Sequence, residues 1–434
     1  MKNLLIVLIA GALFSSCNGL KSIKEAFSDQ PPYETYLKSL KSAGLENTTL
    51  MNKWVEAGKS ALTDSIFIDL PYKEKGYFSD SEPDARSYRF QAKEGKLLQI
   101  DSDVQSEQNG QLFLDLFFYK ESQWKAIAHS DSAAILKYEV EDDGYYLLRI
   151  QPSLLNSAYY NLTINSNPIL INPVQGATNR SIGSFYGAPR DAGARSHEGL
   201  DIFAKRGTPV VAPTDGYVSR VGTNNLGGNV VWLRDNKRGQ SYYFAHLDQQ
   251  LVSSGERVKQ GDTLGLVGNT GNAKNTPPHL HFGIYSSGSK DPLAWVKVAE
   301  KMIDDFKIDS VQFSSLFVTT SKTLNLRSGP GTNFTPIDQL ANNTILKIIG
   351  QFQDWFRIEL PNNQQGFVFK NLIKPTGSGE PLTIKKDQTL LSQASADSIP
   401  ITQLLANSKV SVLGRYNQFQ FVRTLDGQSG WISE

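Results

Sequence analysis

Apolar and polar positions alternate along most of the chain with the two-residue period of β-strands. The clearest alternating runs are 87–91, 97–100, 112–119, 145–150 and 159–164. Glycine, aspartate, asparagine and proline fill the gaps, which is typical of antiparallel strands joined by turns. Helix-like spacing of apolar residues is confined to the N-terminal part, at 36–40 and 50–55. The pattern therefore predicts a mainly β protein with short helices near its N-terminus.

A chain of 434 residues is too long for one hydrophobic core, so we expect several domains. The predicted units are a helical tether over 18–65, a β-sandwich over 66–168, an antiparallel β domain over 169–298, a linker over 299–318, and two small barrels over 319–375 and 381–434.

The two predicted barrels form an internal repeat. Gly350 and Gly366 recur as Gly414 and Gly430, each 64 residues later, and Trp355 recurs as Phe419. An ungapped offset over this length predicts a tandem duplication. An exposed Trp355 could bind a peptide, although aromatic residues of small barrels are more often core residues.

Charge and cysteine content narrow the possible partners. The chain has 44 basic and 43 acidic residues and a net charge of +1, which gives no footprint for nucleic acid or an anionic membrane surface. This balanced charge predicts no nucleic-acid partner. Cys17 is the only cysteine, so no disulfide can form within the chain.

Residues 1–17 are typical of an export signal. Lys2 precedes an apolar run over 4–14, which is too short for a bilayer that needs about 20 residues. A small residue, Ser16, directly before the lone Cys17 resembles a bacterial lipobox. That resemblance implies a signal peptide cleaved before Cys17 and a lipidated Cys17 that anchors the protein to a bacterial membrane. The alternative is an ordinary secretory signal.

Four of the five histidines gather in three short clusters between residues 197 and 281, and only His129 lies elsewhere. His279 and His281 are two apart, so on a strand both imidazoles point to one side while the apolar neighbours face the core. His197, Asp201 and one histidine of that pair would give a zinc site with an open position for water.

Each of these motifs is weak on its own. A His-x-His pair is commonly a surface feature, and the spacing of His197 and Asp201 also suits a helix face, although Gly199 between them disfavours a helix interior. His246 could be a core histidine. The metal interpretation depends on the clusters taken together.

Residues 175–298 resemble the M23 family of zinc metallopeptidases, the lysostaphin-type or LytM-type peptidoglycan endopeptidases. The motifs that carry the resemblance are Ser184-Phe-Tyr-Gly187 with Arg190, His197-x-Gly199-x-Asp201, Tyr243-x-x-His246-Leu247, Gly265-x-x-Gly268-x-Thr270-Gly271 and His279-Leu280-His281-Phe282.

The M23 resemblance implies a site of five residues. His197, Asp201 and His281 would bind one Zn²⁺ per peptidase domain, and His246 and His279 would form the catalytic pair. The loops 184–196 and 269–278 would border a substrate groove.

The flanking units carry resemblances of their own. Residues 66–168 are similar to pre-peptidase jelly-roll domains, and the first repeat, with its Arg327-Ser-Gly-Pro-Gly331 turn, is similar to bacterial SH3 (SH3b) domains. The second repeat has lost that turn. Wall binding is therefore expected of the first copy more than of the second.

Together these resemblances imply a lipid-anchored cell-envelope hydrolase that cuts crosslinks or stem peptides of peptidoglycan. Its anchor would lie in a bacterial membrane, at the outer membrane or facing the periplasm, and a regulatory protein could act on it. The alternative is a non-enzymatic amidase activator or cell-wall-binding protein. Because all five site positions are retained, the peptidase is the favoured hypothesis.

Overall fold

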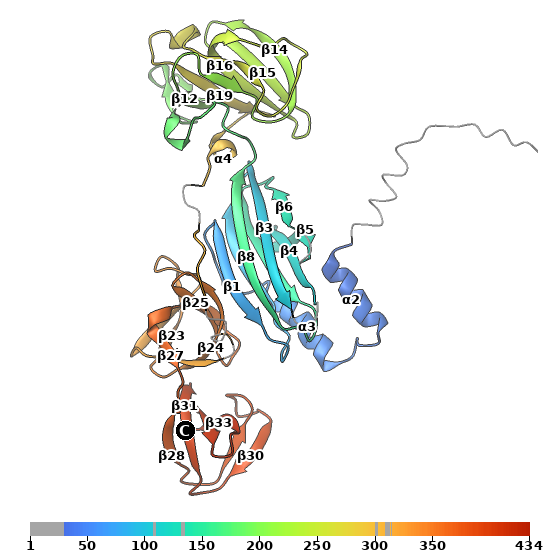
Figure 1. Cartoon of the computed structure of the whole chain (residues 1–434), viewed down its shortest axis with the longest axis vertical. Coiled ribbons are helices and arrows are strands. Elements are labelled where there is room, and N and C mark those ends of the chain that lie inside the picture. Colours follow the sequence, from blue (N-terminus) through green and yellow to red (C-terminus); the bar gives the residue numbers. More distant parts are fainter. Residues whose placement is uncertain (1–29, 107–109, 132–134, 300–302, 309–312, 314) are drawn as a thin grey trace, which may run out of the picture.

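The computed structural model describes residues 30–106, 110–131, 135–299, 303–308, 313 and 315–434. The predicted signal and Cys17 lie outside these residues. The described part is an elongated series of β domains, with the histidine-rich domain at one end and the second repeat at the other (Figure 1). The prediction of a mainly β, multidomain protein is confirmed.

Two helices precede the first β domain, α2 (Pro32–Ser42) and α3 (Thr49–Ser60). Proline at the first position favours the start of α2, and the Thr48 side chain accepts a hydrogen bond from the Met51 amide at the start of α3. Trp54 packs with Phe113 of the β domain and donates a hydrogen bond to the Pro152 carbonyl. Among the described residues, no helix is both long and apolar enough to cross a membrane.

The first β domain is a jelly roll of eight strands in two packed sheets. The strands are β1 (Tyr72–Phe78), β2 (Arg86–Ala92), β3 (Lys96–Ser106), β4 (Leu112–Lys120), β5 (Gln123–Ser130), β6 (Leu136–Glu139), β7 (Gly144–Pro152) and β8 (Ala158–Pro168). One sheet has the order β1-β8-β3-β6 and the other β2-β7-β4-β5. This strand order is that of a jelly roll, and alternate residues such as Phe90, Leu98 and Leu162 fill the space between the sheets.

The second β domain is built on one antiparallel sheet with the order β17-β14-β15-β16-β19-β12-β9. These strands are β9 (Ile182–Ser184), β12 (Leu200–Phe203), β14 (Gly216–Asn224), β15 (Gly228–Asp235), β16 (Gln240–Gln250), β17 (Arg257–Val258) and β19 (His279–Tyr285). Further strands at its edges are β13 (Pro209–Val211), β18 (Thr263–Val267) and β20 (Ser289–Lys290). Side chains such as Leu200, Phe244 and Phe282 form the core on one face.

The two repeats have matching strands at the offset of 64 residues. The first has β21 (Leu316–Thr319), β22 (Thr323–Arg327), β23 (Pro336–Ala341), β24 (Ile345–Phe352), β25 (Trp355–Glu359), β26 (Gln365–Phe369) and β27 (Ile373–Pro375). The second has β28 (Glu380–Thr383), β29 (Gln388–Leu391), β30 (Pro400–Leu404), β31 (Lys409–Tyr416), β32 (Phe419–Thr424) and β33 (Ser429–Ser433). Register shifts at Ile348/Gly350 and Val412/Gly414 keep the same offset. The strand pairs among the described residues do not close a barrel in either copy.

The first repeat is joined to the jelly roll by strand pairing. β24 pairs antiparallel with β1 at Gly350 and Gly76, so the two sheets form one continuous sheet. Beneath this junction the buried Glu74 carboxylate accepts hydrogen bonds from the hydroxyls of Tyr72, Tyr88 and Tyr160. Arg357 of the first repeat is also fully buried there. The junction therefore combines backbone pairing between β1 and β24 with buried charged side chains.

The histidine-rich domain meets the jelly roll at the end of the sheet where β16 begins and β19 ends. Lys96 of β3 donates a hydrogen bond to the Lys297 carbonyl, and Glu139 pairs with Lys237 and Arg238 beside the start of β16. Among the described residues, these contacts leave the opposite end of the sheet, where His246 and His279 lie, facing away from the jelly roll.

Candidate active site

Adjacent strands bring the central residues of the site together. In the pairing of β12 with β19, Asp201 lies directly opposite His281. Their neighbours Ile202 and Leu280 are fully buried in the core, so the strand alternation turns Asp201, His279 and His281 toward the other face. His197 comes from the turn that leads into β12.

His197, Asp201 and His281 have the geometry of a metal-ligand set. His197 Nε2 lies 3.0 Å from Asp201 Oδ1 and 2.9 Å from His281 Nδ1, and His281 Nδ1 lies 3.2 Å from the same Asp201 oxygen. Tetrahedral zinc with bonds of about 2.0–2.2 Å would separate its ligand atoms by about 3.3–3.6 Å. The three side chains already converge on one point and lie slightly closer together than such an ion would hold them.

The surrounding chain fixes the orientation of these ligands. His197 Nδ1 lies 2.8 Å from the Phe185 carbonyl, and because a carbonyl only accepts, this nitrogen carries the proton and Nε2 is free for a metal. Gly199 lets the turn approach β19, since a Cβ there would lie 2.4 Å from the Phe282 carbonyl and 2.9 Å from the His281 ring. This explains the glycine of the His-x-Gly-x-Asp motif.

His246 and His279 form a second pair beside the ligand set, with ring centroids 5.0 Å apart. His246 Nδ1 lies 2.9 Å from the Thr270 carbonyl, and His279 Nδ1 lies 2.8 Å from the Pro277 carbonyl. Both rings therefore donate through Nδ1 and keep Nε2 as an acceptor. His279 Nε2 lies 4.0 Å from Asp201 Oδ1, so the pair adjoins the ligand set.

A local irregularity of β16 directs His246 toward the site. Phe244 and Leu247 both lie in the core, so Ala245 and His246 between them leave the regular alternation. The pairing of β15 with β16 shifts register here, and His246 has a positive φ of 64°. A bulge of this kind re-aims a side chain, and a positive φ is uncommon outside glycine. No local sequence pattern predicted this bulge.

Burial and hydrogen bonds shift the acid–base properties of the site. Burial opposes ionisation of Asp201, but the neighbouring His197 and His281 side chains hold the pKa of its carboxyl well below the usual range. Burial lowers the pKa of His246 to about 4 despite the hydrogen bond to Thr270, and burial also lowers the pKa of His281. Burial thus favours neutral His246 and His281 rings beside an ionised Asp201 carboxylate, which is the protonation state that metal binding needs.

The five candidate residues therefore lie together, and His129 lies apart in β5 of the jelly roll. Sequence reasoning did not find the carbonyls of Phe185, Thr270 and Pro277, because any residue type can supply a carbonyl. The first lies in loop 184–196 and the other two in loop 269–278, so both loops border the histidines. The exposed apolar residues Phe185 and Leu226 lie in segments whose backbone is hydrogen-bonded near His197 and to loop 269–278.

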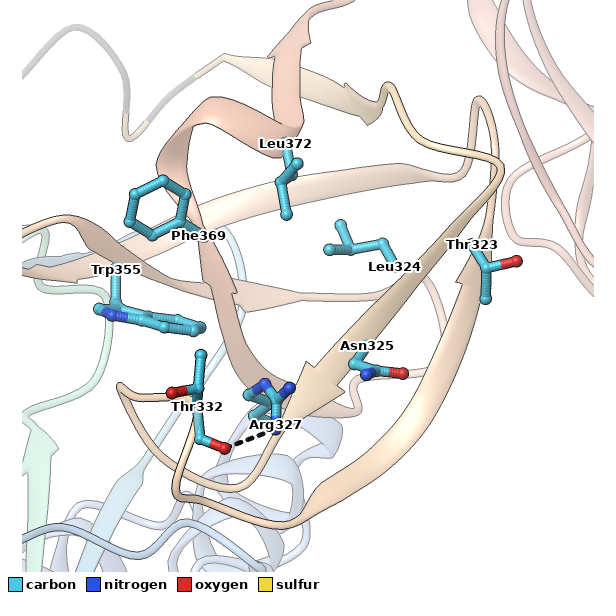
Figure 2. A pocket seen from close by; sticks show the side chains of 8 residues that line it. All are labelled: Thr323, Leu324, Asn325, Arg327, Thr332, Trp355, Phe369 and Leu372. Atoms are coloured by element: carbon cyan, nitrogen blue, oxygen red, sulfur yellow. Dashed lines mark hydrogen bonds between the residues drawn. The ribbon is translucent and has the colours of Figure 1, made fainter.

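An apolar hollow of about 470 Å³ lies in the first repeat, away from the histidines. Figure 2 shows the side chains that line it: Thr323, Leu324, Asn325, Arg327, Thr332, Trp355, Phe369 and Leu372. In the second repeat, Leu391 replaces Arg327 and Phe419 replaces Trp355, and Phe419 is buried against Val318 and Ile345 of the first repeat. The aromatic position is thus used for packing in one copy and lines a hollow in the other.

An antiparallel β domain with a His-Asp-His ligand set and two adjoining histidines is typical of the class of metal-dependent hydrolases. Residues 195–292 match peptidase family M23, and residues 322–374 match the bacterial SH3 domain. The chain therefore carries an M23 peptidase domain followed by a bacterial SH3 domain. Both resemblances inferred from the sequence are confirmed.

Relatives share mainly the peptidase domain. The peptidoglycan DD-endopeptidase ShyC of Vibrio cholerae is 42% identical over 94 residues, which are 22% of this chain and 21% of that protein. The L-Ala–D-Glu endopeptidase of Bacillus subtilis is 36% identical over 126 residues, 27% of this chain and 38% of that protein. The solved catalytic domain of lysostaphin from Staphylococcus simulans is 35% identical, covering 26% of this chain and 87% of that chain with a TM-score of 0.24. The chain thus spans less than two fifths of the length of these two curated relatives.

Proposed function

We propose that this protein is a zinc-dependent endopeptidase that hydrolyses crosslinks or stem peptides of bacterial peptidoglycan. The observation that carries the proposal is the set of His197, Asp201 and His281, whose ligand atoms all lie within 4.8 Å of one another. The M23 match and the similarity to proteins named as peptidoglycan endopeptidases support the reaction and the substrate class.

The donor set fits zinc, which accepts imidazole nitrogen and carboxylate oxygen and keeps an open position at catalytic sites. We assign one Zn²⁺ to His197, Asp201 and His281. Such an ion would polarise the scissile carbonyl and acidify a water molecule.

His246 and His279 supply the acid–base chemistry in this proposal. Each keeps Nε2 as an acceptor because Nδ1 is tied to a backbone carbonyl. One ring takes the proton of the attacking water, and the pair returns a proton to the leaving amine. A protonated ring also stabilises the negative charge that develops on the carbonyl oxygen.

The hollow of the first SH3 unit is the proposed binding surface for the peptide part of the wall. Trp355 and Phe369 offer apolar faces there, and Arg327 offers a positive charge. The second unit lacks these features, so binding is assigned to the first unit alone.

The predicted export signal and the lone Cys17 support a lipid-anchored location in the cell envelope, at the outer membrane or facing the periplasm. Membrane attachment through a lipidated Cys17 predicts that Cys17→Ser moves the protein from the membrane fraction to the soluble fraction of the envelope. Unchanged fractionation of the variant would contradict the anchor.

The test of the proposed function is a digest of purified peptidoglycan by residues 18–434, analysed by mass spectrometry. Zinc-loaded protein is expected to release cleaved peptides, and a chelator or His281→Ala is expected to abolish the release. His129→Ala is the matched control, because it removes the one histidine outside the site and should leave cleavage intact.

If the zinc-loaded, folded chain does not cleave, the isolated 169–298 domain is assayed alone, since cleavage by the domain would mean that the rest of the chain inhibits it. Failure of both the chain and the isolated domain to cleave would overturn the proposal. Stimulation of a separate amidase by metal-free and zinc-loaded protein alike would instead support the non-enzymatic alternative.

A further inference from the structure

Arg190 divides the two oxygens of the Asp201 carboxylate between different partners. Arg190 Nη2 lies 2.7 Å from Asp201 Oδ2 and donates a hydrogen bond to it. The other oxygen, Oδ1, is the one that lies 3.0 Å from His197 Nε2 and 3.2 Å from His281 Nδ1. One carboxylate oxygen therefore faces the ligand set and the other is engaged by a cation.

The position of Arg190 is itself fixed by the chain. The same Nη2 atom donates to Ser184 Oγ at 2.7 Å, and Ser184 lies opposite Asp201 in the pairing of β9 with β12. Arg190 lies in the short strand β10 (Pro189–Arg190), which pairs with β11 (Arg195–Ser196) directly before His197. The His197 amide also donates to the Ala188 carbonyl at 2.8 Å. The guanidinium is thus held on the same backbone unit that places His197.

The contact is strong enough to orient a side chain. Hydrogen bonds between a guanidinium and a carboxylate are charge-assisted, and they gain strength where solvent is excluded. The Asp201 side chain is 11% exposed and the Arg190 side chain 32%. Such a bond stops rotation of the carboxylate about its last side-chain bond.

We propose that Arg190 is a positioning residue that holds Asp201 as a ligand through Oδ1 alone. This inference rests on the proposed zinc site. With Oδ2 engaged, the carboxylate occupies one coordination position, and the remaining position is kept for water and substrate. Without Arg190 the carboxylate is free to turn and to present both oxygens to the ion.

The inference is tested by metal binding to the full 18–434 chain, without any cleavage assay. The variants are Arg190→Met, which removes the donors, and Arg190→Lys, which keeps the charge but not the planar fork. Arg195→Met is the matched control, because Arg195 lies in the same hairpin and pairs with the exposed Asp191.

Zinc affinity is measured by competition with a chromophoric chelator. Loss of a residue that orients a ligand typically weakens metal binding 10- to 100-fold, so we expect Arg190→Met to weaken zinc binding by a factor in that range. Arg190→Lys should have an affinity between those of Arg190→Met and wild type, and Arg195→Met should keep the wild-type affinity. Thermal unfolding of the metal-free proteins is expected to remain cooperative for both Arg190→Met and Arg195→Met, which separates ligand positioning from a general loss of fold.

A cobalt-substituted sample reports the coordination directly. Visible absorption of Co²⁺ is strong in four-coordinate sites and weaker at higher coordination numbers, so Arg190→Met is expected to lose intensity and Arg190→Lys to recover part of it. An Arg190→Met protein that binds zinc within twofold of wild type and keeps the same cobalt spectrum would overturn the inference. Failure of the wild-type chain to bind zinc would instead refute the proposed metal site.

Discussion

Replacing Arg357 by methionine should loosen the junction between the first SH3 unit and the jelly roll. The guanidinium is fully buried. It donates to Gln365 Oε1 at 2.8 Å within its own unit and reaches the Ser87 carbonyl and Asp64 Oδ2 of the jelly-roll side, both at 3.4 Å. Its Nη1 atom lies 3.9 Å from the buried Glu74 carboxylate.

The expected loss in the free energy of unfolding depends on the charge that stays buried after the substitution. Removing one partner of a buried ion pair costs about 3–5 kcal/mol, because the other charge stays buried without it. Glu74 keeps three tyrosine hydroxyl donors at 2.5, 2.7 and 2.5 Å, and methionine fills most of the arginine volume. We therefore expect a loss at the lower end, about 3 kcal/mol.

The assay combines urea denaturation with amide hydrogen exchange. The amides of Gly350 and Gln351 report on the junction because these residues pair with β1, and their exchange should accelerate in Arg357→Met. Arg415→Met is the control, since Arg415 forms an ion pair with Glu434 in which both side chains are at least 41% exposed, and exposed pairs contribute about 0–1 kcal/mol. A loss below about 1 kcal/mol for Arg357→Met would refute the reasoning from buried charge.

Three further predictions follow from the described contacts. Burial and the nearby Asp84 carboxylate raise the pKa of Glu359 from 4.5 to about 7, so the folded state holds this proton more tightly than the unfolded state, and stability falls as pH rises from about 4.5 through 7. Glu359→Gln should therefore raise the melting temperature more at pH 8 than at pH 5, and an equal difference at both pH values would contradict this. Gly228→Ala should reduce cleavage while zinc affinity stays at the wild-type value. The φ of Gly228 is 63°, and a Cβ there would lie 2.2 Å from Thr270 Oγ1, beside the Thr270 carbonyl that orients His246. Unchanged cleavage would count against that role of the loop. Trp355→Ala should release the protein from sedimenting peptidoglycan, whereas Leu405→Ala, at an exposed apolar position of the second unit, should not; co-sedimentation of both variants would exclude the hollow as the binding surface.

Local patterns in the sequence predicted the strands and the site residues for clear physical reasons. Strands with one buried face alternate every two residues, so the β-sandwich was visible in the order of apolar positions. The repeat was visible in residues that recur at an offset of 64. His279 and His281 could be placed on one face by the same rule. The histidine clusters between residues 197 and 281 indicated a metal site, and the resemblance to the M23 family implied the five site positions and their roles.

Contacts between distant parts of the chain could not be predicted in this way. The pairing of Gly76 with Gly350 spans more than half of the chain and involves two glycines with no side chain to mark it. Arg357 reads as an ordinary strand residue in the sequence, yet it is buried at that junction. The positive φ of His246 depends on the register of β15 and β16, which no local pattern encodes. The small barrels predicted from the repeat are not closed by strand pairing among the described residues, and no local pattern encodes closure.

The pairing of β1 with β24 also determines how far apart the two candidate sites can be. Gly76 lies opposite both Gly350 and Tyr160, so the SH3 unit is attached level with Tyr160 on β8. The peptidase domain follows Pro168 at the end of that strand, about 27 Å farther along at roughly 3.4 Å per residue. Because a continuous sheet spans this interval, the proposed cleavage site would lie at a set offset from the proposed wall-binding surface of the SH3 unit. A flexible linker would instead sample many offsets and cut without spatial preference.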